Sequence, residues 1–579
     1  MTRQLGSAKE LPDPNQGLQF EQPALSVPRA TVPPSPHRLT LESVGLDSQL
    51  TAADKYRQLG HSSSWSFSRR VRELIRDTGN GPELHDRIII RDGSYGVPWE
   101  RLPVDLNNLD VPSPEYAEYL LSTISYSLGS MYYLFDKAEF LKKFQNFSKN
   151  KDPEASALTD PWLIQMLIIL GLGKSIAHRE PGPSGPSGHV YFARAVQAFP
   201  SMYFLYEEPI LSIEILCASA LFLQMMDMRL AAYGYLGDAI GMCLAMGLNR
   251  KHDASRISPT EFSHRSKLFW TAYVLDRKLS SLIGVPPRLH DDDIGLPKPS
   301  LAAALTVSET IMAFHIDLSS RLGEILQGSN FVHAVQSVLK RQSDGSKMLQ
   351  EKLKLNFSML AVSETRAVAS LYVLHNLCTI MTIRPVLFFI FEQKVGHGQN
   401  SNVSDASRHL LNLCTEAALN IQEIIHELSE HNIIVPDLLL PFDVDALFAS
   451  AVVLILVDVL LPSGQSWDAG RTLKIMDDMA LRRCIIVGPY KRDLIEIESF
   501  RQHVRAAATL HEGNDSSVGP HGPASTTAGF ARHDINGGLV SEQHVMFESA
   551  LEFLNCSFPD CLPASDLDPF AWVWGDDRE

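Results

Sequence analysis

The sequence predicts an all-α protein, in which a large helical domain is flanked by a disordered N-terminal segment and an acidic C-terminal tail. Between about residues 110 and 510, apolar residues recur at helical spacing, three or four positions apart. Almost no stretch alternates apolar and polar residues with the two-residue period of a half-buried strand. One helical face, at i, +4, +7, +11 and +14, consists of Leu268, Ala272, Leu275, Leu279 and Leu282.

The composition limits the classes of function. The chain has 579 residues, 45% of them hydrophobic, which is enough for a large core, and its formal net charge is −16. Because a uniformly acidic surface repels phosphate backbones, we expect any contact with nucleic acid to be confined to a local basic patch. The seven cysteines include no C-x-x-C pair, so their spacing predicts neither a disulfide framework nor a zinc site. A reduced, intracellular chain is expected.

No segment of the sequence predicts a membrane span. The N-terminal residues lack the apolar core of a secretory signal. The longest low-charge runs, near 162–177 and 446–457, fall short of the ~20 residues that a spanning helix needs. Both runs therefore predict buried helices, and no membrane partner is expected.

Residues 1–60 are predicted to be disordered. Seven prolines fall within the first 40 residues, most densely in "VPPSPHR", and such a composition does not easily form a packed core. The helical domain is predicted over residues 61–510. Its segment "PILSIEILCASALFLQMM" is apolar nearly all round, as in a helix deep inside a bundle. Connecting loops are predicted at 178–189 and 394–405.

The last part of the chain differs from the helical domain in composition. Residues 511–540 are rich in Gly, Ser and Pro and predict a flexible linker. Residues 541–579 contain nine acidic residues, one basic residue and several aromatic residues that are expected to be exposed. This composition is typical of a disordered transcriptional activation segment, with packing of the tail on the core as the alternative. The aromatic residues expected to recruit a partner are Phe547, Phe553, Phe570, Trp572 and Trp574.

Two short segments resemble catalytic motifs without matching their spacing. "LGLGKS" ends like a phosphate-binding loop, but the position of the first required glycine is Ile168. "HELSEH" places His426 and His431 five residues apart, whereas two zinc ligands on one helix face must be four apart. Both segments are predicted to be ordinary helix, the first buried and the second solvated.

The aspartate run Asp291–Asp293 is the strongest candidate for a metal site. Helical isoprenoid synthases hold Mg²⁺ through D-D-x-x-D, because this spacing gathers carboxylates on one helix face. Here the position four after Asp293 is Pro297, and two prolines precede the run, so an extended loop is predicted. In such a loop the aspartates would cap a helix, stabilise a turn, or form ion pairs with Arg277, Arg288 or Lys298.

Basic residues cluster once, near the start of the helical domain. Over residues 53–77, six basic and three acidic residues leave a local charge of +3. The cluster predicts a solvated helix face first, with contact to DNA phosphates as the alternative. Its candidate residues are Arg69, Arg70, Arg72 and Arg76.

Three segments together resemble a known family. "LGHSSSWSFSRRV", "GYLGDAIGMCLAMGLNR" and "SHRSKLFWTAYVLDRKLSSLIGVPPRLHDDDIGLPKP" are similar to the middle regulatory domain of fungal zinc-cluster transcription factors, also named after the xylanolytic activator. The third segment carries R-x-x-L-F-W-x-x-Y-x-L-D-R, then G-x-P, then D-D-D-I-x-L-P. The residues that fit this pattern are Trp270, Tyr273, Asp276, Arg277, Gly284, Pro286, Asp291, Asp292, Asp293, Leu296 and Pro297.

The resemblance implies an all-helical regulatory domain that acts in the nucleus, with the aspartate run as part of its architecture. The family binds DNA through six cysteines that hold two zinc ions. This sequence has no cysteine before Cys217. We therefore expect no zinc cluster and no other cofactor in this chain, through evolutionary loss or a missing upstream exon. DNA contact is then expected to be indirect or to use the basic cluster.

Three functions follow from these expectations. The leading hypothesis is a nuclear transcription regulator of a metabolic gene set, such as a secondary-metabolite cluster, with a coactivator or the transcription machinery as partner. Homo- or heterodimers with related factors are expected. The second hypothesis is a non-activating interaction partner or co-repressor of such factors. The third, an α-helical metal-dependent enzyme, is disfavoured by the aspartate spacing, and no catalytic or metal-binding residue is expected.

Overall fold

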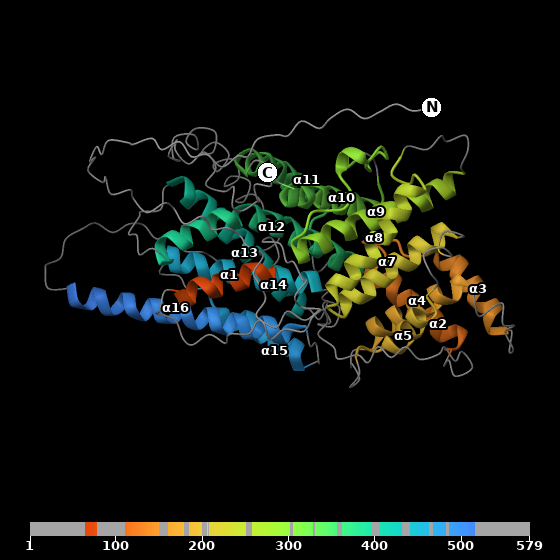
Figure 1. The fold of residues 1–579 in the computed structure, drawn as a ribbon, viewed down its shortest axis with the longest axis horizontal. Coiled ribbons are helices and arrows are strands. Elements are labelled where there is room, and N and C mark those ends of the chain that lie inside the picture. Colours follow the sequence, from red (N-terminus) through yellow and green to blue (C-terminus); the bar gives the residue numbers. More distant parts are fainter. Residues whose placement is uncertain are drawn as a thin grey trace, which may run out of the picture.

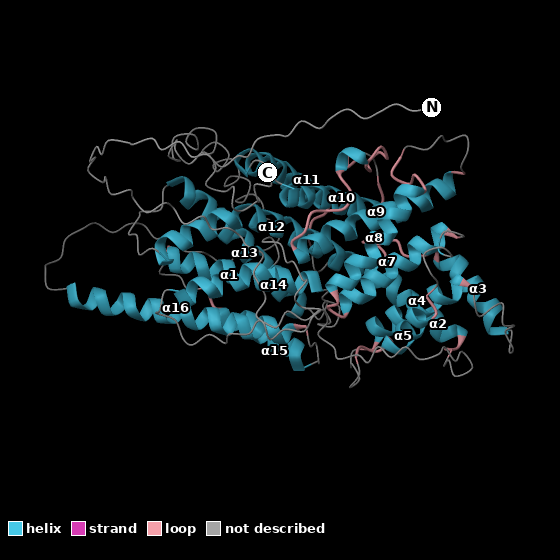
Figure 2. Ribbon diagram, viewed as in Figure 1, coloured by secondary structure: helices cyan, strands magenta, loops and turns pink. Residues whose placement is uncertain are grey.

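The computed structural model describes residues 64–77, 111–149, 160–178, 185–199, 205, 208–250, 258–301, 305–327, 331–355, 362–396, 405–430, 441–461, 467–481 and 486–515. Helices account for the regular structure in these ranges and no strand occurs in them, which confirms the all-α prediction (Figure 2). The predicted disordered segment 1–60 and the acidic tail 541–579 lie outside the described residues.

The helices in these ranges vary from nine to thirty residues in length. A single turn of 3-10 helix, η4, and a short π-helical segment, η5, complete the regular structure. In chain order the elements are α1 (Ser64–Asp77), α2 (Pro114–Leu128), α3 (Lys137–Lys149), α4 (Pro161–Ala177), α5 (His189–Gln197), α7 (Pro209–Met225), α8 (Arg229–Ala245), α9 (Pro259–Ile283), η4 (Asp291–Asp293), α10 (Val307–Gln327), α11 (Phe331–Lys352), α12 (Val362–Phe391), η5 (Glu392–Gly396), α13 (Asp405–Glu430), α14 (Pro441–Leu460), α15 (Ala469–Leu481) and α16 (Val487–Asp515).

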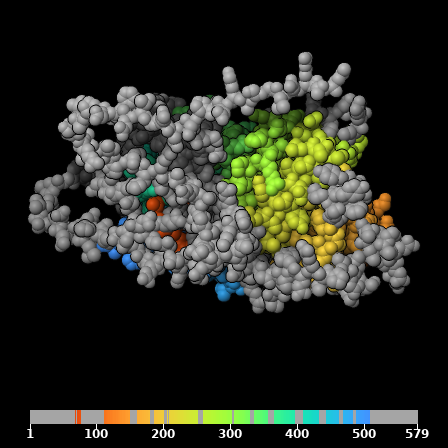
Figure 3. Space-filling model, viewed as in Figure 1, coloured from red at the N-terminus to blue at the C-terminus, as the bar shows by residue number. Residues whose placement is uncertain are grey.

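The helices form two groups, with α9 and α10 between them (Figure 1). In the first group, α4 packs against α2, α5 and α7, and α7 packs against α8. In the second group, α14 packs against α12, α13 and α16. The middle helices join the groups, because α9 contacts α7 and α8 on one side and α14 on the other, while α10 contacts α12. The middle of the chain, coloured yellow to green, forms one continuous patch on the face that is drawn (Figure 3).

Helix α4 contains the segment that resembles a phosphate-binding loop. The helix begins at Pro161, and the side chain of Asp160 accepts a hydrogen bond from the Trp162 backbone N–H at 2.8 Å, as an N-cap does. Almost every residue of the helix is buried, including Gly171 and Ser175. The prediction of a buried helix here is confirmed.

One helix within the described ranges is long and apolar enough to cross a membrane. It spans Glu364–Lys394, which comprises most of α12 and part of η5, and 83% of its most apolar window is buried inside the protein. Its neighbours are α10, α13 and α14, so its apolar surface is covered by other helices. The apolar run near 446–457 is likewise buried, within α14.

One helix end agrees with its prediction and one boundary differs from it. His426 lies in the last turn of α13, with its Nε2 3.1 Å from the exposed carboxylate of Glu430, which confirms a solvated helix end, while His431 lies outside the described residues. Helix α16 continues to Asp515, so the first residues of the predicted linker 511–540 are helical.

Candidate functional site: the aspartate clasp between α9 and α10

Helix α9 has strong start and stop signals. Ser258 caps its N-terminus, because its hydroxyl accepts a hydrogen bond from the Glu261 backbone N–H at 3.2 Å. The helix ends at Gly284, whose φ of 75° lies in the left-handed region that glycine adopts without strain. The N–H groups of Gly284 and Val285 both donate to the Ser280 carbonyl, at 2.8 and 3.0 Å. The two prolines that follow prevent the helix from resuming.

The aspartate run lies in the loop after α9, as predicted, but not in a fully extended conformation. His290 has extended backbone angles, and Asp291–Asp293 then form the single 3-10 turn η4. The Asp293 N–H donates to the His290 carbonyl at 3.1 Å. One turn of this kind does not gather the three carboxylates on a common face, because three residues per turn spread them around the axis.

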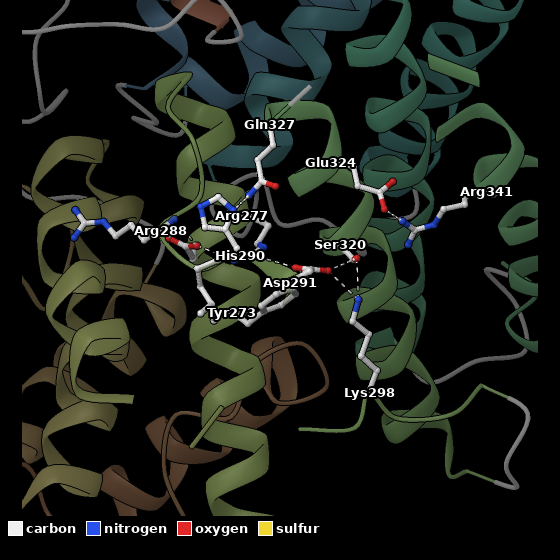
Figure 4. A network of polar contacts seen from close by, with 12 residues as sticks. Tyr273, Arg277, Arg288, His290, Asp291, Lys298, Ser320, Glu324, Gln327 and Arg341 are labelled. Carbon is white, nitrogen blue, oxygen red and sulfur yellow. Dashed lines mark hydrogen bonds and ion pairs between the residues drawn. The ribbon is translucent and has the colours of Figure 1, made fainter. Parts of the chain in front are cut away.

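Asp291 is the centre of a polar network that joins α9, the loop and α10 (Figure 4). Its Oδ1 accepts hydrogen bonds from the Tyr273 hydroxyl and the Arg277 guanidinium, both at 2.8 Å. Its Oδ2 accepts from the Ser320 hydroxyl at 2.6 Å and from the Lys298 ammonium at 2.9 Å. We call Asp276, Asp291 and these four donors the aspartate clasp.

Arg277 is the buried cation of the clasp. Its side chain is 1% exposed, and it pairs with the fully buried carboxylate of Asp276 at 2.8 Å as well as with Asp291. Its guanidinium also lies 3.9 Å from the centre of the Tyr273 ring and donates to the Leu289 carbonyl. A planar guanidinium suits this position, since it serves two carboxylates and an aromatic face together.

The two carboxylates of the clasp differ in electrostatic environment. Burial opposes ionisation of Asp291, but hydrogen bonds from Ser320, Lys298 and Tyr273 outweigh it and lower the pKa of Asp291 to about 2. Burial raises the pKa of Asp276, while Arg277 and backbone N–H groups, including that of Arg288 at 3.1 Å, act in the opposite direction. Asp291 is therefore ionised at any physiological pH.

Other contacts fix the rest of the loop to α8. Asn249, just after α8, donates from its side chain to the Asp293 carbonyl at 2.8 Å, and its own carbonyl accepts from the Leu296 N–H at 2.8 Å. The Arg288 guanidinium lies 3.9 Å from the centre of the Tyr233 ring, and a Cβ at Gly237 would overlap it. The loop is thus held on both sides, by α8 and by α10.

The remaining aspartates of the run are solvated. Asp292 and Asp293 are exposed. Within the described ranges, no group of three or more His, Cys, Asp or Glu side chains is arranged to hold a metal ion. The expected pairing with Arg277 and Lys298 is confirmed for Asp291, whereas Arg288 contributes its backbone N–H to Asp276.

The other residues of the family pattern surround the clasp. Trp270 is buried and packs edge-on against Phe269 and Tyr273, with ring centres 5.1 and 5.2 Å apart. Pro286 lies in the loop, and its carbonyl accepts a hydrogen bond of 3.5 Å from Ser280. These residues build the bend between α9 and the loop.

The basic cluster on α1 requires a correction for Arg72. Its side chain is 5% exposed and pairs with Asp493 at 3.1 Å and Glu496 at 2.6 Å, so it does not face solvent as a DNA-contact residue would. The side chains of Arg69, Arg70 and Arg76 lie outside the described residues, and their contact with DNA stays a prediction. The five aromatic residues proposed for the tail, Phe547, Phe553, Phe570, Trp572 and Trp574, also lie outside.

One partner of the clasp and one partner of the neighbouring loop backbone were not predicted. Ser320 comes from α10 and Asn249 from the end of α8, far from the aspartate run in sequence. Neither carries a local signal, because a serine inside a helix and an asparagine after one are common. The only available hint was that Asp291 needs more donors than Arg277 and Lys298 provide.

The aspartate clasp lies within a segment that matches a known family. Residues 125–384 match a family described as the fungal specific transcription factor domain. The chain is 22% identical over 436 residues to an uncharacterised transcriptional regulatory protein of Schizosaccharomyces pombe, covering 71% of this chain and 52% of that protein. It is 21% identical over 420 residues to the thiamine repressible genes regulatory protein thi1 of the same yeast, covering 69% and 52%.

A further relative comes from another fungus. An ABC-transporter-regulating transcription factor of Aspergillus oryzae is 24% identical over 296 residues, covering 47% of this chain and 32% of that protein. The chain spans about half the length of the first two relatives, at 52% each. No solved structure matches the chain.

Proposed function

We propose that the protein is a nuclear regulator that controls the transcription of a specific metabolic gene set, since its residues 125–384 match the fungal specific transcription factor domain. The observation that carries the proposal is the match of this domain, with the aspartate clasp inside it, to fungal transcriptional regulators. The clasp supports a structural role for the motif, because its carboxylates are occupied by protein donors.

The target genes are proposed from the chemistry that the relatives regulate. One relative is named for thiamine-repressible genes and another for ABC transporters. A set of genes repressed by thiamine is responsive to a metabolite, and by analogy we propose a metabolic gene set here, of which a secondary-metabolite cluster is one example. The overall charge of −16 disfavours broad contact with DNA, so promoter contact would be indirect or would use Arg69, Arg70 and Arg76.

Two parts of the chain would carry out two different functions. The helical domain would receive a signal or bind related factors, as a homo- or heterodimer. The tail would recruit the transcription machinery or a coactivator through its aromatic side chains, which acidic neighbours keep solvated until a partner's groove binds them. No zinc cluster or other cofactor is assigned to this chain in the proposal.

Fusion of the full chain to a foreign DNA-binding domain tests this function. We expect the fusion to activate a reporter gene, and we expect a variant with Phe547, Phe553, Phe570, Trp572 and Trp574 replaced by Ala to return it to background. A matched control replaces five described, exposed residues of the helical domain by Ala. Immunoblots must show equal amounts of each fusion in the nucleus.

The outcome also separates an activator from a restraining partner. Overexpression of the unfused chain should raise the transcripts of its target genes if it activates, and lower them if it is a co-repressor. A silent fusion that is present in the nucleus at normal levels contradicts the activation role of the tail.

A further inference from the structure

Helix α3 lies at one end of the molecule and packs on the first helix group through its apolar face (Figure 1). Phe140 and Phe144 on this face are buried. The centres of the Phe140 and Phe147 rings each lie 5.9 Å from the centre of the Trp162 ring, at the start of α4. Among the helices, the main neighbour of α3 is α2. The opposite face of α3 is therefore presented to solvent.

This outer face combines lysines with amide side chains. The exposed residues at i, +3, +4 and +7 are Lys142, Gln145, Asn146 and Lys149. We call these four residues the α3 polar face. Within the part of the chain that the structure describes, none of the four side chains forms an ion pair or a hydrogen bond. Lys143, at the edge of the face, is by contrast paired with Glu139 at 3.0 Å.

The C-terminal half of α3 is basic, although the chain as a whole has a net charge of −16. The acidic side chains near this helix, Asp136 and Glu139, lie at its N-terminal end. Asp136 accepts a hydrogen bond from the Glu139 backbone N–H at 2.9 Å. Residues 140–149 contain three lysines and no acidic residue. Lysines gathered along one helix face are the electrostatic pattern of a surface that binds phosphates.

The amides, and the lack of large exposed apolar residues, indicate which partner suits this face. Lysine binds phosphate oxygens, and asparagine and glutamine bind phosphate oxygens or base edges. An acidic protein segment with aromatic anchors would need apolar surface for its rings, and the large hydrophobic side chains exposed in the described ranges include none on α3. A single helix, about 10–12 Å in diameter, also fits the major groove of DNA, which is about 12 Å wide.

We propose that the α3 polar face binds the phosphate backbone of double-stranded DNA, with Lys142 and Lys149 as the phosphate contacts. This would give the chain a direct contact with a promoter. The inference rests on the proposed function only in taking DNA as the partner. The cluster is not visible as a run in the sequence, because Phe144 and Phe147 separate its members until the helix gathers them on one face.

Fluorescence anisotropy of the full chain with a short labelled DNA duplex, over a series of salt concentrations, tests the proposal. We expect Lys142→Gln with Lys149→Gln to weaken the affinity at low salt by about tenfold. The slope of log K against log salt should become shallower by about 2, because each lost phosphate contact removes about 0.9. Lys142→Arg with Lys149→Arg keeps both charges and should keep the affinity of the natural protein.

The matched control is Lys340→Gln with Lys347→Gln, which removes two exposed lysines at the same spacing on α11. Its DNA affinity should stay within about twofold of that of the natural protein. Circular dichroism must show the same unfolding transition for every variant. An equal loss of affinity in the control, an unchanged affinity in the Lys142/Lys149 glutamine variant, or no binding of the duplex by the natural protein at low salt would each overturn the proposal.

A poly-glutamate peptide serves as the competing probe. If the glutamine variant loses binding to this peptide but keeps its DNA affinity, the α3 polar face binds acidic protein segments and the proposal is wrong. A failure here is distinguishable from a failure of the proposed function, because the reporter fusion brings its own DNA-binding domain. The fused Lys142→Gln, Lys149→Gln chain should activate the reporter as strongly as the fused natural chain.

Discussion

Two consecutive residues of α9, Arg277 and Lys278, are both almost fully buried, yet the protein surrounds them differently. Arg277 faces the loop and α10 and has two carboxylates at 2.8 Å. Lys278 faces α14 and the segment that follows α2, where it donates to the Tyr132 hydroxyl at 3.2 Å and lies 4.8 Å from the centre of the Phe442 ring. Within the described ranges, it forms no ion pair.

The comparison shows that the energetic effect of burying a charge in this fold depends on the partners of that charge. Arg277 is stabilised by opposite charges, so removal of any partner leaves another buried charge uncompensated. Lys278 donates to a hydroxyl and lies against aromatic rings, and burial lowers its pKa to about 8, with Asp443 offsetting part of the effect. The aspartate clasp should therefore be sensitive to substitution, whereas the surroundings of Lys278 should tolerate or favour a neutral side chain.

Replacement of the paired cation should have the largest effect. We expect Arg277→Met to lower the free energy of unfolding by about 3–5 kcal/mol, because it leaves Asp276 buried without a counterion. Urea denaturation followed by circular dichroism measures the change. Arg265→Met is the control on the same helix, since its pair with Glu261 is partly exposed and should be worth under about 1 kcal/mol. Equal losses in the two variants would remove the distinction between buried and exposed pairs.

Neutralisation of the clasp's central carboxylate should have the next largest effect. We expect Asp291→Asn to lower the free energy of unfolding at pH 7 by about 2 kcal/mol, a figure reduced for solvent screening because 35% of the side chain is exposed.

The effect of Asp291→Asn on the free energy of unfolding should depend on pH. The pKa of Asp291 is about 2 in the fold, below the ~3.9 of an unfolded aspartate, so its stabilisation is present above pH ~3.9 and is lost as the pH falls towards 2. The difference in the free energy of unfolding between the natural protein and Asp291→Asn should be constant from pH 7 to 5 and should become smaller below pH 4. A gap that stays constant down to pH 3 would contradict the role of the charge.

Replacement of the unpaired cation should act in the opposite direction. We expect Lys278→Met to raise the free energy of unfolding at pH 7 by about 1–2 kcal/mol, because it removes a buried ammonium without a carboxylate partner. The folded pKa of about 8 lies below the ~10.4 of an unfolded lysine, so the unfolded chain binds more protons in this window and stability rises with pH.

The natural protein should therefore approach the stability of Lys278→Met between pH 8 and 10. Lys267→Met, at an exposed position on the same helix, serves as the control and should change stability by no more than about 0.5 kcal/mol. A destabilised Lys278→Met protein would show that the ammonium is needed where it lies.

The parts of this site that could be predicted from the sequence are those set by near neighbours in the chain. The end of α9 follows from Gly284 and the prolines after it, and the pairing of Asp291 with Arg277 and Lys298 follows from their closeness. The donor from Ser320 depends on how α10 packs against α9, which no local pattern encodes. For the same reason, a basic cluster on α1 did not reveal that Arg72 is buried against α16.

The smallest expected effect belongs to the rest of the aspartate run, and it tests whether the run acts as a unit. Asp292 and Asp293 are exposed, and the contact of Asp293 with Asn249 uses the backbone carbonyl, which asparagine keeps. Asp292→Asn with Asp293→Asn should therefore change the free energy of unfolding by no more than about 0.5 kcal/mol. A loss as large as that of Asp291→Asn would mean that the charge of the whole run holds the loop. If the double substitution abolished a Mg²⁺-dependent activity and left the fold intact, this would instead support the hypothesis of a metal-dependent enzyme. The expected result leaves Asp291 as the structural residue of the three, because only its carboxylate reaches the buried arginine.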